Sequence, residues 1–218
     1  MSKPDMTEPG WTQVEPADGG WHRGDWMQTY TGGRFYPLDP TPEQVNPIDI
    51  AHALSMLCRY NGHIDRFYSV AEHCVLMSEW IERVTGDQTL ALEGLLHDGS
   101  EAYCGDMVRP LKHSGVMADY IRAEDDVMVA IAKRFGLNLS YPSGWVGIGP
   151  ATHSKSPIVK EADTRILLTE RMALMSNYKP SDRWKADDLQ ALPVIIQAWS
   201  PAEAERAYLE RLTLLGAL

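Results

Sequence analysis

Residues 95–101 read Leu-Leu-His-Asp-Gly-Ser-Glu, and this stretch decides how the rest of the chain is interpreted. It continues an apolar segment that should bury one face of a helix, predicted over residues 88–102. Yet it places an imidazole and a carboxylate, His97 and Asp98, side by side. Burying such groups unpaired is costly, so they need partners or a bound ion. Glu101 shares their side of the predicted helix, because residues three and four positions apart are neighbours on a helix surface.

Two more polar residues lie on other predicted helices. The sequence Ser-Val-Ala-Glu at residues 69–72 is a capping box, which begins a helix that carries His73 in its first turn. Asp163 lies in a helix predicted over residues 158–177. Two histidines and two aspartates are a sufficient ligand set for a divalent metal. The four candidate ligands are His73, His97, Asp98 and Asp163.

These residue types indicate the chemistry but leave the metal open. Mixed oxygen and imidazole ligands suit Co, Mn, Zn, Mg or Fe. A metal lowers the pKa of a nearby water toward about 7, and Glu101 could orient or deprotonate that water as a general acid/base. Taken one at a time, these residues could also have a purely structural role. A histidine on an apolar helix face is usually a hydrogen-bonded core residue, and Asp163 could pair with Arg165 on a solvated face.

Composition limits the classes of partner. The chain has 218 residues, 44% of them hydrophobic, and a formal net charge of −10. A negative protein is a poor binder of nucleic-acid polymers or anionic membranes, whereas a few local cations and a metal can still hold a small phosphorylated substrate. The three cysteines form no CxxC pair, no apolar run approaches a bilayer span, and the N-terminus does not resemble a secretory signal. We therefore expect a cytoplasmic protein.

The remaining sequence predicts an all-α bundle. Residues 1–25, rich in Gly, Pro and Trp, are expected to be a flexible or partner-binding arm, and residues 26–218 one domain. Residues 26–42 suggest a short hairpin or an irregular loop, and residues 138–157 a long loop. Further helices are predicted after Asn46-Pro47, over residues 120–135 up to Gly136, and after a capping box at residues 200–203.

The motif around the His-Asp doublet resembles that of a known family. Residues 97–112 fit the pattern HD-x-x-E-x-x-x-G-D-x-x-x-P-x-K, and with His73 and Asp163 they give the order H…HD…D. This combination is similar to the HD-domain metal-dependent phosphohydrolases, in the branch with bacterial 5′-deoxynucleotidases and phage dATP triphosphohydrolases. The segments 36–40 and 50–55 resemble the phage-type subgroup more closely. The resemblance covers roughly residues 26–180 and implies an HD-domain helical bundle.

The resemblance also implies roles for individual residues. The four candidate ligands would hold the metal, Glu101 would position or activate the attacking water, and Asp106 would lie beside the sugar or assist proton transfer. Arg59 matches an arginine that contacts the substrate phosphate, and Tyr60 an aromatic residue that packs on the sugar. Tyr60 stands where related nucleotidases often have Trp, which leaves sugar discrimination open. Lys112 could contact phosphate or be a surface lysine.

The expected activity is hydrolysis of deoxynucleotide phosphates by a homo-oligomer. Removal of triphosphate from dATP, as part of nucleotide-pool control, is the leading hypothesis because of the likeness to the phage-type subgroup. The alternatives are a 5′-deoxynucleotidase acting on dNMPs, a hydrolase of a cyclic or signalling nucleotide, and a nucleotide-binding regulatory module. A spare carboxylate beside the ligands, such as Glu101, favours an enzyme over a structural metal site.

Overall fold

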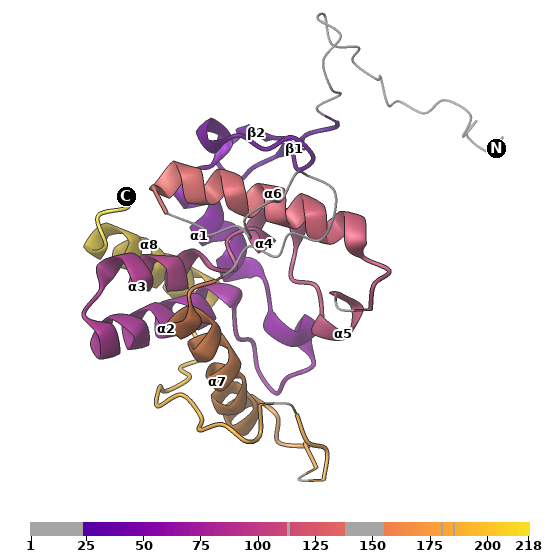
Figure 1. Ribbon diagram of the computed structural model, residues 1–218, viewed down its shortest axis with the longest axis vertical. Helices are drawn as coiled ribbons and strands as arrows, with labels where there is room; N and C mark the ends of the chain where they lie inside the picture. Colours follow the sequence, from indigo (N-terminus) through magenta and orange to yellow (C-terminus); the bar gives the residue numbers. More distant parts are fainter. Residues whose placement is uncertain (1–23, 113, 138–154, 180, 185) are drawn as a thin grey trace, which may run out of the picture.

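The computed structural model describes residues 24–112, 114–137, 155–179, 181–184 and 186–218, and these are predominantly α-helical. The predicted all-α class is therefore confirmed (Figure 1). Most of the expected N-terminal arm (residues 1–23) and of the expected long loop (residues 138–154) lies outside the described residues. The elements in chain order are β1 (Met27–Gln28), β2 (Arg34–Phe35), η1 (Pro42–Gln44), α1 (Pro47–Met56), η2 (Arg59–Gly62), α2 (Val70–Thr85), α3 (Gln88–Leu96), α4 (Glu101–Cys104), α5 (Arg109–Lys112), α6 (Ala118–Phe135), α7 (Pro157–Leu174) and α8 (Pro201–Leu214).

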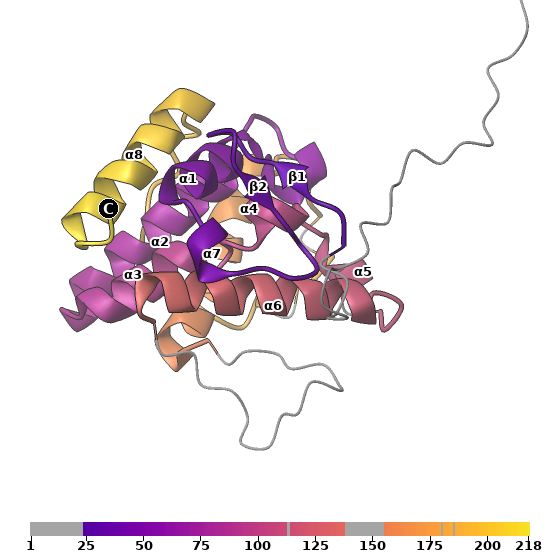
Figure 2. The ribbon, with the colours of Figure 1, turned by 90° about the horizontal axis from the view of Figure 1, so that it is seen from above.

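Helix α2 is the central element, and it contributes to two hydrophobic cores. One face packs with α1, α3, α6 and α8 in the first core, and another packs with α7 and residues 192–196 in the second. Viewed from above, α6 crosses one side of the molecule while α8 lies at the opposite side (Figure 2). The approach of α2 to α3 is close, since a Cβ added at Gly94 would lie 2.5 Å from Cδ1 of Ile81. The two cores therefore meet along α2.

The caps form largely as the sequence predicts. Asn46 accepts a hydrogen bond from the backbone N–H of Ile48. Pro47 is the first residue of α1, and its lack of an N–H costs nothing there, because the first N–H groups of a helix have no partner within the helix. The capping box at residues 200–203 opens α8, and Gly136 ends α6 in the left-handed conformation, φ 66°. The short antiparallel pair of β1 and β2 confirms the hairpin.

The single helix predicted over residues 88–102 is wrong, because the chain turns at the His-Asp doublet. Helix α3 ends at Leu96, whose carbonyl accepts a hydrogen bond from Gly99 N–H (2.8 Å), and α4 begins only at Glu101. Gly99 lies close to α6, since an added Cβ would be 3.2 Å from Cδ1 of Ile131. Local packing thus replaces the regular helix with a tight turn, and Asp98 lies in that turn.

Two smaller predictions also need correction. Helix α7 covers Pro157–Leu174 instead of residues 158–177. At the start of α2, Ser69 caps the N–H of Glu72 as predicted, but the Glu72 carboxylate does not return to complete the capping box. It accepts hydrogen bonds from the backbone N–H groups of residues 197–199 instead, at 2.7, 2.9 and 2.7 Å. Among the described helices, none is long and apolar enough to cross a membrane.

Candidate metal centre

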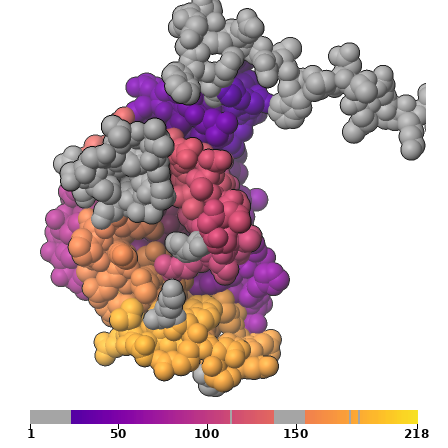
Figure 3. Space-filling view, turned by 45° about the vertical axis from the view of Figure 1, so that its right-hand side comes forward, coloured from indigo at the N-terminus to yellow at the C-terminus, as the bar shows by residue number. Residues whose placement is uncertain are grey.

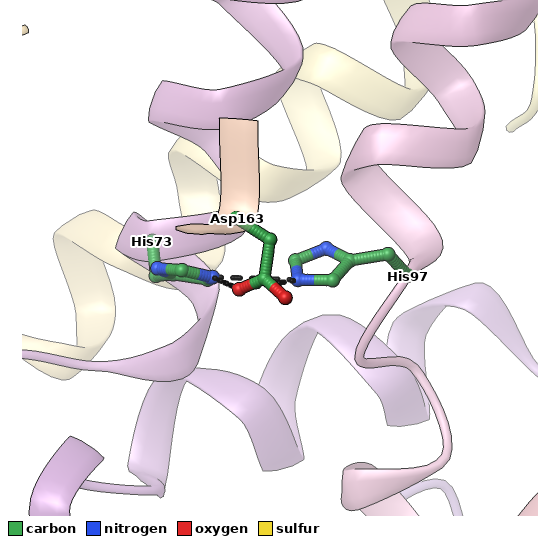
Figure 4. Close-up of side chains that lie close together, drawn as sticks. All are labelled: His73, His97 and Asp163. Atoms are coloured by element: carbon green, nitrogen blue, oxygen red, sulfur yellow. Dashed lines mark hydrogen bonds and ion pairs between the residues drawn. The ribbon is translucent and has the colours of Figure 1, made fainter. Parts of the chain in front are cut away.

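The four predicted ligands converge from three separate parts of the chain. His73 comes from the first turn of α2, His97 and Asp98 from the turn after α3, and Asp163 from α7. Figure 4 shows the Asp163 carboxylate pointing between the two imidazole rings. Both histidines are buried, whereas the two aspartates are partly accessible, with 14% and 26% of their side chains exposed. Buried imidazoles and accessible carboxylates define a site that opens toward solvent.

The ligand atoms lie within a few ångströms of one another. The Nε2 atoms of His73 and His97 are 3.3 Å apart, and Oδ2 of Asp98 is 3.7 and 3.0 Å from them. Oδ1 of Asp163 lies 3.7 Å from Nε2 of His73 and 3.9 Å from Nε2 of His97. This is the spacing of atoms that surround a common point, and the His73, His97 and Asp163 group could hold a metal ion.

The outer nitrogen of each imidazole is fixed by an acceptor. Nδ1 of His73 lies 2.6 Å from Oε1 of Glu170, and Nδ1 of His97 lies 2.8 Å from the carbonyl oxygen of Gly94. Because a carboxylate and a carbonyl only accept, each Nδ1 carries a proton. Each Nε2 atom therefore faces the cluster, as in a histidine that binds a metal through Nε2.

Electrostatics keep the site in its ligand form. Burial lowers the pKa of His73, and Arg59 lowers it further, so this imidazole is neutral. Burial alone would raise the pKa of Asp98, but His97 and Lys155 hold it well below its usual range. Asp163 behaves similarly, since Lys155 and His97 outweigh burial and lower its pKa. The result is a neutral His73 imidazole beside two ionised carboxylates.

These residues fit a divalent metal. Two imidazole nitrogens that face each other at 3.3 Å, with carboxylate oxygens beside them, are the donor set that a divalent cation takes. Cys74, His97 and Asp98 form a second possible group. It fits less well, because burial raises the pKa of the Cys74 thiol well above its usual range and a metal binds the thiolate. The group of His73, His97 and Asp163, with Asp98 beside it, is therefore the one that could better hold a metal ion.

The two predicted catalytic carboxylates lie in the same electrostatic environment. Glu101, at the start of α4, is buried, and its Oε2 has no hydrogen-bond partner among the described residues. Burial raises the pKa of Glu101 well above its usual range, and the charges of Asp98 and Asp106 raise it further. Burial also raises the pKa of the half-buried Asp106. Both carboxyl groups therefore keep a proton to higher pH than an exposed carboxyl group does, which is common at functional sites.

Arg59 and Tyr60 approach the cluster together from η2. Nη1 of Arg59 lies 3.6 Å from Oδ2 of Asp98, and its Nε lies 3.4 Å from Oε1 of Glu170. The Tyr60 hydroxyl donates a short hydrogen bond to the other oxygen of Glu170. Tyr60 and Asn61 adopt positive φ angles of 56° and 50°, which asparagine adopts more readily than a bulky residue such as tyrosine does.

Within the described residues, Lys112, unlike Arg59 and Tyr60, forms no hydrogen bond or ion pair with the residues around the candidate ligands. Its ammonium group pairs with the buried carboxylate of Glu124 on α6. Burial would lower the pKa of Lys112, but Glu124 raises it. Its role as a phosphate contact stays a prediction, since the structure directs it to Glu124 and not to the metal ligands.

Sequence reasoning missed two residues of the site, Glu170 and Lys155. Glu170 is seven residues, two helical turns, after Asp163, so it lies on the same face of α7, and this spacing could have revealed it. Lys155 lies before α7, with Nζ 3.4 Å from Oδ1 of Asp98 and 3.6 Å from Oδ2 of Asp163. No helical periodicity links it to the motif. Trp184 adds an aromatic ring near Tyr60, at a centroid distance of 6.3 Å.

Comparison with known proteins places the chain among bacterial relatives. No protein-family model matches it. It is 37% identical over 122 residues to "Uncharacterized protein RCAP_rcc00048" of Rhodobacter capsulatus, a match that covers 54% of this chain and 62% of the relative. It is 36% identical over 148 residues to "Uncharacterized protein YfdR" of Escherichia coli K12, covering 68% of this chain and 71% of the relative. The chain therefore belongs to the same family as YfdR of Escherichia coli.

Proposed function

We propose that this chain is an HD-domain type, metal-dependent phosphohydrolase that acts on deoxynucleotide phosphates, with dATP as its leading substrate. The convergence of His73, His97, Asp98 and Asp163, with the outer nitrogen of each imidazole fixed by an acceptor, carries the proposal. The order of these residues in the chain matches the H…HD…D motif. The spare buried carboxylate of Glu101 supports catalysis over a structural metal site, which needs only its ligands.

The proposed reaction converts dATP and water into deoxyadenosine and triphosphate. Water attacks the α-phosphorus, the bond from phosphorus to O5′ breaks, and O5′ gains a proton. A divalent metal held by the four ligands would supply positive charge to the phosphate and lower the pKa of nearby water. Glu101 orients that water and takes its proton, while Asp106 lies beside the sugar or assists proton transfer. Arg59 neutralises charge on the phosphate.

A substrate panel tests this proposal. The purified protein would be loaded in turn with Mn, Co, Zn, Mg and Fe and incubated with mono-, di- and triphosphates of deoxy- and ribonucleosides. Released phosphate, pyrophosphate and triphosphate would be separated and quantified. The proposal expects triphosphate from dATP, and none without metal or with Asp98→Asn. Phosphate from dNMPs would favour the 5′-deoxynucleotidase alternative, and tight nucleotide binding without turnover would favour the regulatory module.

A further inference from the structure

The position of Lys155 suggests a role that the motif does not include. Lys155 precedes α7 by two residues and is 26% exposed at its side chain, so its ammonium group borders both the ligand cluster and solvent. Nζ lies 3.4 Å from Oδ1 of Asp98 and 3.6 Å from Oδ2 of Asp163. Both distances exceed the usual length of a charge-assisted hydrogen bond. The three ammonium donors are therefore not saturated by these two carboxylates.

The backbone beside Lys155 is held firmly in place. Ser156 donates two hydrogen bonds to Glu93 of α3, from its backbone N–H to Oε1 (2.6 Å) and from its hydroxyl to Oε2 (2.5 Å). This two-point attachment fixes the start of α7 against the end of α3, the helix that leads into the His-Asp doublet. The backbone that carries Lys155 is thus fixed beside the cluster, and from there the Lys155 ammonium reaches both aspartates.

Charge balance indicates what Lys155 could bind. Arg59, on the other side of Asp98, already faces the buried carboxylate of Glu170. Lys112 is paired with Glu124. A phosphate group approaching the ionised Asp98 and Asp163 is repelled unless cations face it as well. Of the lysines in the described chain, Lys155 is the one whose ammonium contacts both of these carboxylates.

We propose that Lys155 is the phosphate-binding lysine of this site, where its ammonium group and the Arg59 guanidinium flank Asp98 and receive a substrate phosphate between them. The inference rests on the proposed function, because it concerns the phosphate chain of the same substrate. It differs from the motif-based expectation, which gives this role to Lys112. A lysine acts here as a compact charge with rotatable donors, which suits a phosphate chain that moves during bond cleavage.

Binding of inorganic tripolyphosphate to the metal-loaded full chain tests the inference without turnover. We expect Lys155→Met to weaken this binding about 10- to 100-fold, which corresponds to the loss of one charge-assisted hydrogen bond. Lys155→Arg should retain most of the affinity, and Lys160→Met, at an exposed position on α7, should match the wild type. Metal content, measured in parallel, should be unchanged in all three variants. Titration calorimetry and elemental analysis provide these readouts.

The outcomes separate this inference from the proposed function. Unchanged tripolyphosphate affinity in Lys155→Met, or no binding by the wild type, overturns the role of Lys155. Loss of metal instead of phosphate affinity also overturns it, since Lys155 would then act on the metal site. If tripolyphosphate binding depends on Lys155 but no nucleotide is hydrolysed, the hydrolase proposal fails and this one stands. If Lys155→Met does not fold, Lys155→Gln, which keeps a polar side chain, is measured in the same way.

Discussion

At the scale of single residues, Glu101 is the carboxylate on which catalysis should depend. It is buried beside the cluster, and Oε2 has no hydrogen-bond partner among the described residues. We expect Glu101→Gln to slow hydrolysis about 100-fold or more, while metal and nucleotide still bind, because the amide cannot accept a proton from water. Turnover would be measured beside metal content. Glu161→Gln, at an exposed position on α7, is the control, and undiminished turnover in Glu101→Gln would exclude its acid/base role.

Glu170 should act on the metal through His73. Its Oε1 accepts the Nδ1 proton of that ring, while Oε2 accepts the hydroxyl proton of Tyr60. Partners of this kind orient metal-binding histidines, and their loss typically weakens metal binding about 10- to 100-fold. We expect a loss of this size in Glu170→Gln, measured by competition with a chelating dye. Equal metal affinities for Glu170→Gln and the control Glu161→Gln would show that Glu170 does not orient the ring.

At the scale of elements, the sequence predicted the helices and their N-terminal caps more accurately than it predicted where a helix is interrupted. The caps at Asn46, Ser69 and Ser200 are local, because a side chain within three residues satisfies the free N–H groups. The end of α3 at Leu96 depends on how Gly99 packs against α6. The site follows the same division. Its four candidate ligands lie in a recognisable order along the sequence, whereas the contacts of Lys155 arise only in the folded chain.

The Glu72 carboxylate makes a long-range contact that no local sequence pattern predicts. Its carboxylate accepts three backbone N–H groups from residues 197–199, and so attaches the segment before α8 to the first turn of α2. We expect Glu72→Gln to lower the free energy of unfolding by about 2–3 kcal/mol, because the amide N–H₂ would face a donor. Urea denaturation would measure this. Glu79→Gln, exposed on the same helix, is the control, and equal stability of both variants would contradict the prediction.

The contact between α2 and α8 predicts a dependence of stability on pH. Arg211 donates to Oγ and the carbonyl of Ser78 and pairs with Glu82 (Nη1 to Oε2, 2.6 Å). The hydrogen bond from Arg211 lowers the pKa of Glu82. A lowered folded-state pKa contributes stability above the unfolded value of about 4.3, and this contribution is lost as the pH falls through the folded pKa.

Glu82→Gln tests this sign. We expect the variant to be less stable than the wild type at pH 7, and the difference to shrink below about pH 4 as Glu82 becomes protonated in the wild type. The expected difference is small, because an exposed carboxylate is screened by solvent. Urea denaturation at pH steps from 7 to 3 would measure it. A difference that stays constant across this range would rule out the charge of Glu82 as its cause.

At the scale of the whole molecule, the site lies where the two cores meet. The neighbours of His73 on α2 divide between them, with Cys74 and Val75 in the first core and Leu76 and Met77 in the second. The ligands follow this division, since His97 extends from α3 in the first core and Asp163 from α7 in the second. In the space-filling view, the surface of α7 (orange) and the surface of α5 and α6 (pink) appear on the same face of the molecule (Figure 3).

Because the ligands join the two cores, metal should stabilise the entire fold. A metal that binds only the folded protein adds about 2.7 kcal/mol at 100 times its dissociation constant. For a chain of this size, that corresponds to a rise in Tm of roughly 5–10 °C. We expect a chelator to lower Tm by this amount and excess metal to restore it, as measured by scanning calorimetry. Asp98→Asn, which loses a ligand, should show little change on chelation. If chelation leaves the wild-type Tm unchanged, the metal does not join the two cores.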